Sequence, residues 1–72
     1  MKLSMAEEGK EYTVTSIDTD DKELNSFLFT LGCYAGETIT LIKQRKSGSI
    51  VVIKDGRYGI DRRLSDAISV DG

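Results

Sequence analysis

Residues 28–42 read LFTLGCYAGETITLI, and this stretch decides the fold. The apolar positions before Gly32 are three and four residues apart, which is the period of a helix. After Gly36 the apolar positions alternate, with Ile39 and Leu41 two residues apart, which is the period of a strand. Gly32 follows the last helical position, where a left-handed residue ends a helix at the least cost. The stretch therefore predicts the end of a helix, a loop and a strand in immediate succession.

The predicted helix begins near Asp21 and ends at Leu31, which is about three turns. Asp20 is expected to cap its first turn, with Glu23 reaching back in a capping box. A helix of this length is marginal alone, so its apolar face must pack against the rest of the chain. The apolar residues expected on that face are Leu24, Phe27, Leu28 and Leu31.

Short β-branched or alternating segments predict five strands around this helix. One lies upstream, YTVTSI at 12–17, and four lie downstream, at 37–43, 50–53, 58–60 and 68–70. The connections are a polar loop at 44–49, a hairpin turn at Asp55-Gly56 and one helical turn at 64–67. We expect a mostly β fold, a small, partly open SH3-like barrel of five strands with one α-helix between strands 1 and 2. Closing the barrel would remove the open sheet edges.

Length and composition exclude most chemistry. A chain of 72 residues has room for one domain, here residues 1–72. It contains no histidine and one cysteine, so it has no imidazole base, no histidine-ligated metal and no internal disulfide. No phosphate-binding glycine loop, nucleophile elbow or metal-ligand spacing is present. We expect a protein that is not an enzyme, with no catalytic residues, no metal site and no cofactor.

The charge is unevenly distributed. The net charge of −2 is the sum of −4 over residues 1–36 and +2 over residues 37–72. The basic residues gather around two turns, where they form either an ordinary solvated surface or a face that meets an acidic partner. The acidic balance and only five aromatic residues argue against nucleic acid as a partner. The absence of a signal peptide and of a long apolar run predicts a cytoplasmic location.

The helix end and its loop are the candidate partner-binding surface. Tyr34 either packs on its own barrel or anchors an interface. Phe29 lies 100° around the helix from Leu28 and either covers the barrel edge or extends an exposed patch. Leu28 has the core as its alternative, and Cys33 is expected to be a small apolar residue and not a reactive thiol. The predicted patch with its basic rim comprises Leu28, Phe29, Leu31, Cys33, Tyr34, Lys43, Arg45 and Lys46.

The order of these motifs resembles the FeoA family of ferrous iron transport accessory proteins. The segment at 28–42 is similar to the family's helix–Leu-Gly–loop–Gly–strand signature, and the likeness runs from about Leu3 to Val70. The family commonly has a proline just before the second glycine, where this chain has Ala35, which leaves the loop freer. The matching positions are Leu28, Leu31, Gly32, Gly36 and Ile39.

The resemblance implies a cytoplasmic accessory protein that acts on FeoB, a membrane Fe(II) transporter with a cytosolic GTP-binding domain. A membrane role would then come only through that partner. Two alternatives stay open. One is a small barrel that binds nucleic acid. The other is a stand-alone regulatory module like the SH3-like domain of some iron-dependent repressors, in which carboxylates would reach a transition metal ion.

Overall fold

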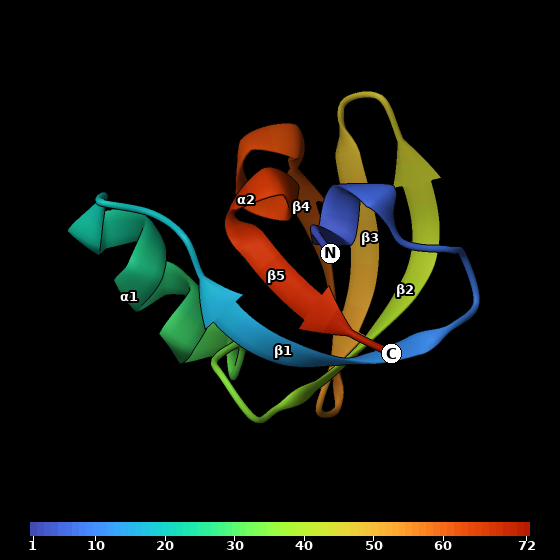
Figure 1. The fold of residues 1–72 in the computed structure, drawn as a ribbon, viewed down its shortest axis with the longest axis horizontal. Coiled ribbons are helices and arrows are strands. Elements are labelled where there is room, and N and C mark those ends of the chain that lie inside the picture. Colours follow the sequence, from blue (N-terminus) through green and yellow to red (C-terminus); the bar gives the residue numbers. More distant parts are fainter.

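The computed structural model describes all residues, 1–72, and contains one five-stranded antiparallel sheet (Figure 1). The strand order is β4-β3-β2-β1-β5. Along the chain, a short 3-10 helix comes first, α1 lies between β1 and β2, and α2 joins β4 to β5. The elements are η1 (Leu3–Met5), β1 (Glu11–Ile17), α1 (Lys22–Leu31), β2 (Thr38–Arg45), β3 (Gly48–Ile53), β4 (Gly56–Asp61), α2 (Arg62–Ala67) and β5 (Ile68–Asp71).

The core lies inside the curved sheet and is formed by one face of each strand. In β1, buried Tyr12 and Val14 alternate with exposed threonines, and in β2 buried Ile39 and Leu41 follow the same period. Fourteen buried residues form this single cluster. Its N-terminal member, Leu3, is fully buried although no periodicity in the sequence marked it.

The predicted barrel is not closed by strand pairing. Five antiparallel strands are present, but β4 and β5 are the two ends of the ladder and do not pair with each other. The connection between them is the six-residue helix α2, whose Leu64, Ser65 and Ala67 are buried. Asp61 begins this helix, because its Oδ1 accepts a hydrogen bond from the Leu64 N–H at 2.9 Å. Helix α2 therefore connects β4 to β5, and these two strands do not form the pairing that would close the sheet.

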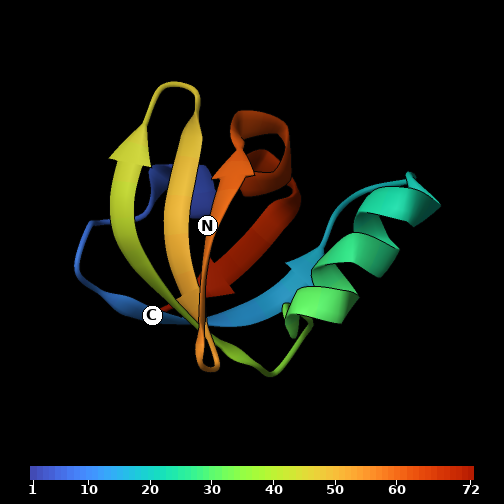
Figure 2. The same cartoon turned by 180° about the vertical axis from the view of Figure 1, so that it is seen from behind.

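The two edges of the sheet differ. The edge at β5 is covered by the N-terminal segment, where the Met1 amino group donates to the Val70 carbonyl at 2.9 Å and the Val70 N–H donates to the Met1 carbonyl at 2.7 Å. A bridge between Lys2 and Ser69 extends this contact. At the other edge, β4 has β3 as its one neighbouring strand (Figure 2).

Helix α1 was predicted within one residue, but its cap was misplaced. The capping residue is Asp21, whose Oδ1 accepts hydrogen bonds from the N–H groups of Glu23 at 2.9 Å and Leu24 at 3.3 Å. The expected capping box from Asp20 is wrong by one position, because Asp20 precedes the cap. Thr19 supports the turn instead by accepting a hydrogen bond from the Asp21 N–H at 3.1 Å. Gly32 ends the helix at φ 88°, as predicted.

Helix α1 packs on the protein through a narrower face than its apolar pattern predicted. Leu28 is its one fully buried residue, while Leu24 and Leu31 are partly buried against the core. Phe27, expected on the packed face, is 48% exposed. At 100° per residue, Phe27 lies 40° beyond Leu31 and outside the arc that faces the sheet. Figure 1 shows the N-terminal turns of α1 standing away from the sheet.

The polar segment 44–49 is mostly strand and not a loop. β2 continues to Arg45 and β3 begins at Gly48, so the turn is only Lys46-Ser47. The polar side chains inside the ladder are satisfied by one another: Ser49 bonds to Gln44 and lies 2.9 Å from the Ser65 hydroxyl. The Gln44 side-chain amide donates to the Leu3 carbonyl at 2.9 Å. Polarity suggested a loop here because the sequence does not show these long-range bonds.

Candidate partner-binding groove

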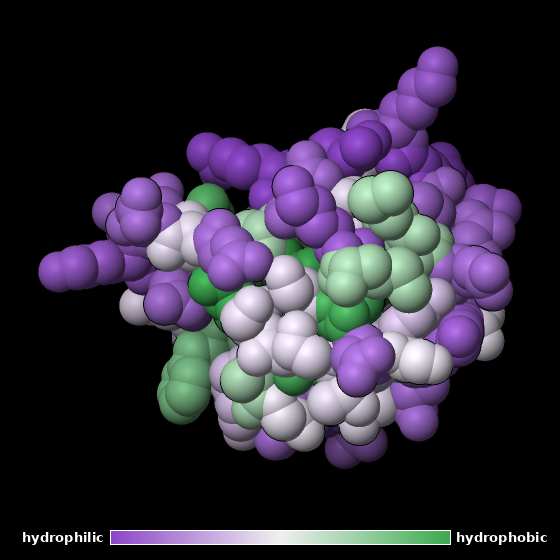
Figure 3. Space-filling model, viewed as in Figure 1, coloured by the Kyte–Doolittle hydropathy of each residue, from purple (hydrophilic) through white to green (hydrophobic).

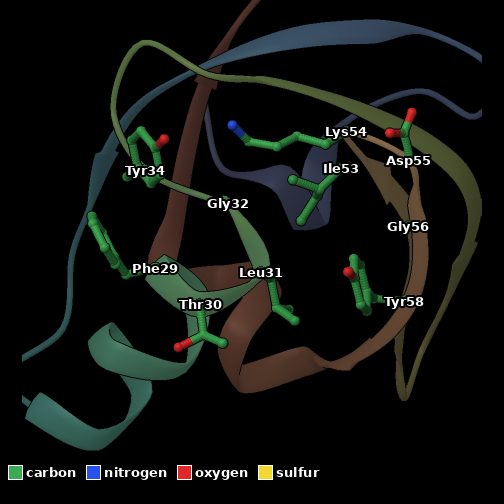
Figure 4. Close-up of a pocket in the computed structure, with 10 residues that line it drawn as sticks. All are labelled: Phe29, Thr30, Leu31, Gly32, Tyr34, Ile53, Lys54, Asp55, Gly56 and Tyr58. Carbon is green, nitrogen blue, oxygen red and sulfur yellow. The ribbon is translucent and has the colours of Figure 1, made fainter.

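An open groove of about 560 Å³ lies between the C-terminal end of α1 and the turn that joins β3 to β4 (Figure 4). We call it the helix–hairpin groove. One side is formed by the helix end and the loop after it, and the other by the tip of the hairpin. Its lining residues are Phe29, Thr30, Leu31, Gly32, Tyr34, Ile53, Lys54, Asp55, Gly56 and Tyr58.

The helix side of the groove presents an aromatic pair. The rings of Phe29 and Tyr34 have centroids 5.0 Å apart with planes inclined by 31°. Phe29 is 65% exposed, which is unusual for a side chain of this size. Figure 3 shows hydrophobic side chains at lower left, where α1 lies in that view, next to a mainly polar surface. A large apolar group held at the surface by a neighbouring ring is suited to contact with another molecule.

Lys54 connects the two sides of the groove. Its Nζ lies 5.7 Å from the Tyr34 ring centroid and 3.8 Å from a carboxylate oxygen of Glu37. Helix α1 has no basic residue in its last turn, so Lys54 is the cation beside the negative end of the helix dipole. Figure 4 shows the Lys54 side chain extending past Gly32 toward Tyr34. The groove therefore combines apolar rings with the cation of Lys54 and the carboxylate of Asp55, while Glu37 pairs with Lys54 without lining the groove.

Gly32 allows the helix end and the hairpin tip to meet. Besides its left-handed φ, a Cβ at this position would lie 2.7 Å from Lys54 Cε and 3.5 Å from Ile53 Cγ2. A side chain at position 32 would force the end of the Lys54 side chain out of its place beside the helix end.

The structure divides the predicted apolar patch. Phe29, Leu31 and Tyr34 line the groove, with Phe29 exposed and the other two partly buried. Leu28 and Cys33 are 0% and 1% exposed, so neither contributes to a surface. Both belong to the core cluster, and burial raises the pKa of the Cys33 thiol to about 11. Cys33 thus behaves as the small apolar residue that was predicted, without thiolate character at neutral pH.

The residues of the predicted basic rim lie at the opposite end of β3 from the groove. Lys43, Arg45 and Lys46 are exposed, but they lie toward or in the β2–β3 turn, and the groove is at the β3–β4 turn. The six residues of β3 separate the two turns by roughly 17–20 Å. The cation at the groove is Lys54, which was not among the predicted site residues.

The hairpin side of the groove was missed, although strand direction would have indicated it. The loop from α1 enters β2 at Thr38, and antiparallel pairing brings the end of β3 to the start of β2, as in the pair Ile39–Ile53. The tip after Ile53 must then lie beside the helix end. Applying this alternation of direction to the predicted strands would have added Lys54 and Tyr58 to the candidate site.

No group of three or more His, Cys, Asp or Glu side chains is placed to hold a metal ion. Helix α1, the longest, has ten residues, whereas a helix that spans a bilayer needs about 20.

Comparison with known proteins places the fold. The model of the FeoA domain family matches residues 1–72. The crystal structure of an iron uptake regulatory protein (FeoA) superposes with a TM-score of 0.87 at 22% identity, covering 97% of this chain and 93% of that one. For Stenotrophomonas maltophilia FeoA, an SH3 domain protein solved with zinc, the TM-score is 0.85 at 18% identity, covering 99% and 89%.

The same fold occurs inside larger proteins. A manganese-dependent transcriptional repressor matches with a TM-score of 0.89 at 18% identity, over 97% of this chain but 40% of the repressor. These identities are low enough that the likeness describes the fold alone. No curated protein sequence matches the chain.

Proposed function

This chain belongs to the FeoA family, which is associated with ferrous iron transport, and we propose on that basis that it is an accessory protein of FeoB-type iron uptake. It acts in the cytoplasm by binding the cytosolic GTP-binding domain of the transporter and catalyses no reaction itself. The contact surface is the helix–hairpin groove. The observation that carries the proposal is the exposed ring of Phe29, which packs on the partly buried ring of Tyr34 at the edge of that groove.

The size of the molecule supports a binding role. The chain exposes 4438 Å², and a standard protein interface takes about 800 Å² from each partner, roughly a fifth of this surface. A single binding face therefore uses a large share of the molecule. Aromatic anchors seated in a groove contribute most of the energy of such interfaces, and Phe29 and Tyr34 have the chemistry of these anchors.

The position of the groove supports the same proposal. Its helix side is attached to the core mainly by Leu28, with Leu24 and Leu31 partly buried, and the one ion pair at its hairpin side is Lys54–Glu37 at 3.8 Å. Lys54 and Glu37 have 54% and 33% exposed side chains, and an ion pair at that exposure is worth little. The two sides are thus joined by weak contacts, and a partner that inserts between them displaces little of the protein's own structure.

Replacing Phe29 with glutamate is the test, and Phe27 provides the matched control. Both phenylalanines are exposed on α1, but they lie 200° apart around the helix and only Phe29 lines the groove. We expect Phe29→Glu to weaken binding to the cytosolic domain of FeoB by at least about 30-fold, the effect of losing about 2 kcal/mol. Phe27→Glu should bind like the wild type. Isothermal titration calorimetry measures both, and equal affinities for the two variants would contradict the proposal.

A further inference from the structure

The free edge of β4 has no proline, no bulge and no covering segment, three features that usually prevent a strand from pairing. The other edge of the sheet is covered by Met1 and Lys2, but β4 has no neighbour beyond β3. The chain contains no proline, and β4 pairs with β3 through six consecutive residue pairs without a bulge. An uncovered, regular edge is a template for another strand.

The direction of the backbone groups on this edge follows from two contacts. The β3–β4 hairpin has a two-residue turn that ends at the pair Ile53–Gly56, and the Arg62 N–H donates to the Ser47 carbonyl at 2.9 Å. In an antiparallel ladder, pairs that exchange hydrogen bonds alternate with pairs that do not. Both contacts involve even-numbered residues, Gly56 and Arg62, so the N–H and C=O groups of the even-numbered residues of β4 point toward β3. The N–H and C=O groups of Arg57 and Gly59 therefore point away from the sheet. Neither residue forms a backbone hydrogen bond outside the helices and ladders.

Gly59 leaves the middle of this edge without a side chain. It is exposed, and a Cβ added there would meet no atom within 4 Å. Another backbone can therefore approach the N–H and C=O of Gly59 without meeting a side chain.

The sequence of β4 is complementary to itself about Gly59. It reads Arg57-Tyr58-Gly59-Ile60-Asp61, with opposite charges two residues to each side of the glycine and apolar residues one to each side. If a second copy paired antiparallel with Gly59 opposite Gly59, Arg57 of each copy would face Asp61 of the other. Opposite charges directly across two strands stabilise the pair. Neither Arg57 nor Asp61 forms an ion pair within the chain, and Asp61 uses only Oδ1 to cap α2.

We propose that two copies of this chain associate through β4 to form a twofold-symmetric dimer with a continuous ten-stranded sheet. The central register pairs Gly59 with Gly59, and the Arg57–Asp61 pairs close both ends. The charge pattern favours a second copy over an unrelated strand, because the same five residues supply both halves of each complementary pair. A twofold axis also closes the assembly at two molecules, since each chain has a single free edge.

Sedimentation equilibrium of the full chain over a range of concentrations up to about 1 mM tests the dimer. The weight-average mass should rise from 8.0 kDa toward twice that value. Gly59→Pro removes the outward N–H from an edge strand that tolerates proline, so it should remain monomeric at every concentration. Gly59→Ala keeps the N–H and has room for its methyl group, so it should still dimerise. A wild type that stays at 8.0 kDa throughout, or equal dimerisation of these two variants, overturns the proposal.

A charge reversal gives a second test that does not disturb the backbone. Arg57→Asp places two aspartates opposite each other at both ends of the register and should shift the protein to monomer. Lys43→Asp makes the same change of net charge at an exposed residue of β2, away from the free edge, and should dimerise like the wild type. Equal dimerisation of the two variants would show that Arg57 and Asp61 do not meet, which contradicts the register.

Discussion

Replacing Leu28 with alanine is expected to lower the free energy of unfolding by about 2–5 kcal/mol, which is most of the stability of so small a domain. Leu28 is 0% exposed and is the one fully buried residue of α1. The substitution leaves a cavity beneath the helix and removes its largest contact with the core, where Leu24 and Leu31 are only partly buried. Urea denaturation followed by far-ultraviolet circular dichroism measures the loss.

The Leu28 result also decides between two roles for this residue. The sequence allowed Leu28 either in a partner-binding patch or in the core, and the structure places it in the core. Phe29→Ala, on the exposed side of the same helix, should change stability by no more than about 0.5 kcal/mol. If Leu28→Ala were as stable as the wild type, the packing of α1 described above would be wrong.

Gly48→Ala is expected to be the most damaging glycine substitution in the sheet, with a loss of at least about 3 kcal/mol. A Cβ at position 48 would collide with the Ile60 carbonyl oxygen and lie 2.9 Å from Asp61 Cα. Both are backbone atoms of β4, which cannot move aside by a change of rotamer. Separation of the strands would break the β3–β4 ladder and displace the Asp61 cap of α2.

Gly59→Ala is the matched control for Gly48→Ala, because Gly59 also lies in the β3–β4 hairpin and its Cβ would meet nothing. Thermal unfolding should give a midpoint close to that of the wild type for Gly59→Ala and a much lower one for Gly48→Ala. Similar midpoints for the two variants would show that β3 and β4 do not approach as closely at Gly48 as the structure indicates.

Local patterns predicted the elements well because each of them has a local cause. The 3.6-residue period and Gly32 located α1. The Asp55-Gly56 pair located the β3–β4 hairpin, but its turn is one residue earlier, at Lys54-Asp55, and Gly56 begins β4. The cap was displaced because Asp20 and Asp21 are chemically identical neighbours. Leu3 was missed for a different reason, since its burial depends on η1 packing against residues more than sixty positions away, as in the Ser4–Asp66 hydrogen bond of 2.5 Å.

The candidate site was half predicted. The helix side was found because Phe29 and Tyr34 are close in sequence to the motif that ends α1. The hairpin side was missed because Lys54 reaches the groove only through the strand pairing that brings Ile53 beside Ile39. Basic residues near a turn were expected at the rim of the site. One basic residue, Lys54, does lie at the groove, but it is in the β3–β4 turn and not near the β2–β3 turn. Composition cannot distinguish the two turns, whereas strand direction can.

Nuclear magnetic resonance titration of the isotope-labelled chain with the cytosolic domain of FeoB tests the proposed binding surface most directly. We expect the largest backbone amide shift changes at the two sides of the helix–hairpin groove, in residues 29–34 and 53–58. The β2–β3 turn at Lys46-Ser47 lies at the opposite end of β3 and should change little, as should Lys43 and Arg45 before it. Shift changes concentrated at that turn, with the groove unaffected, would contradict the account.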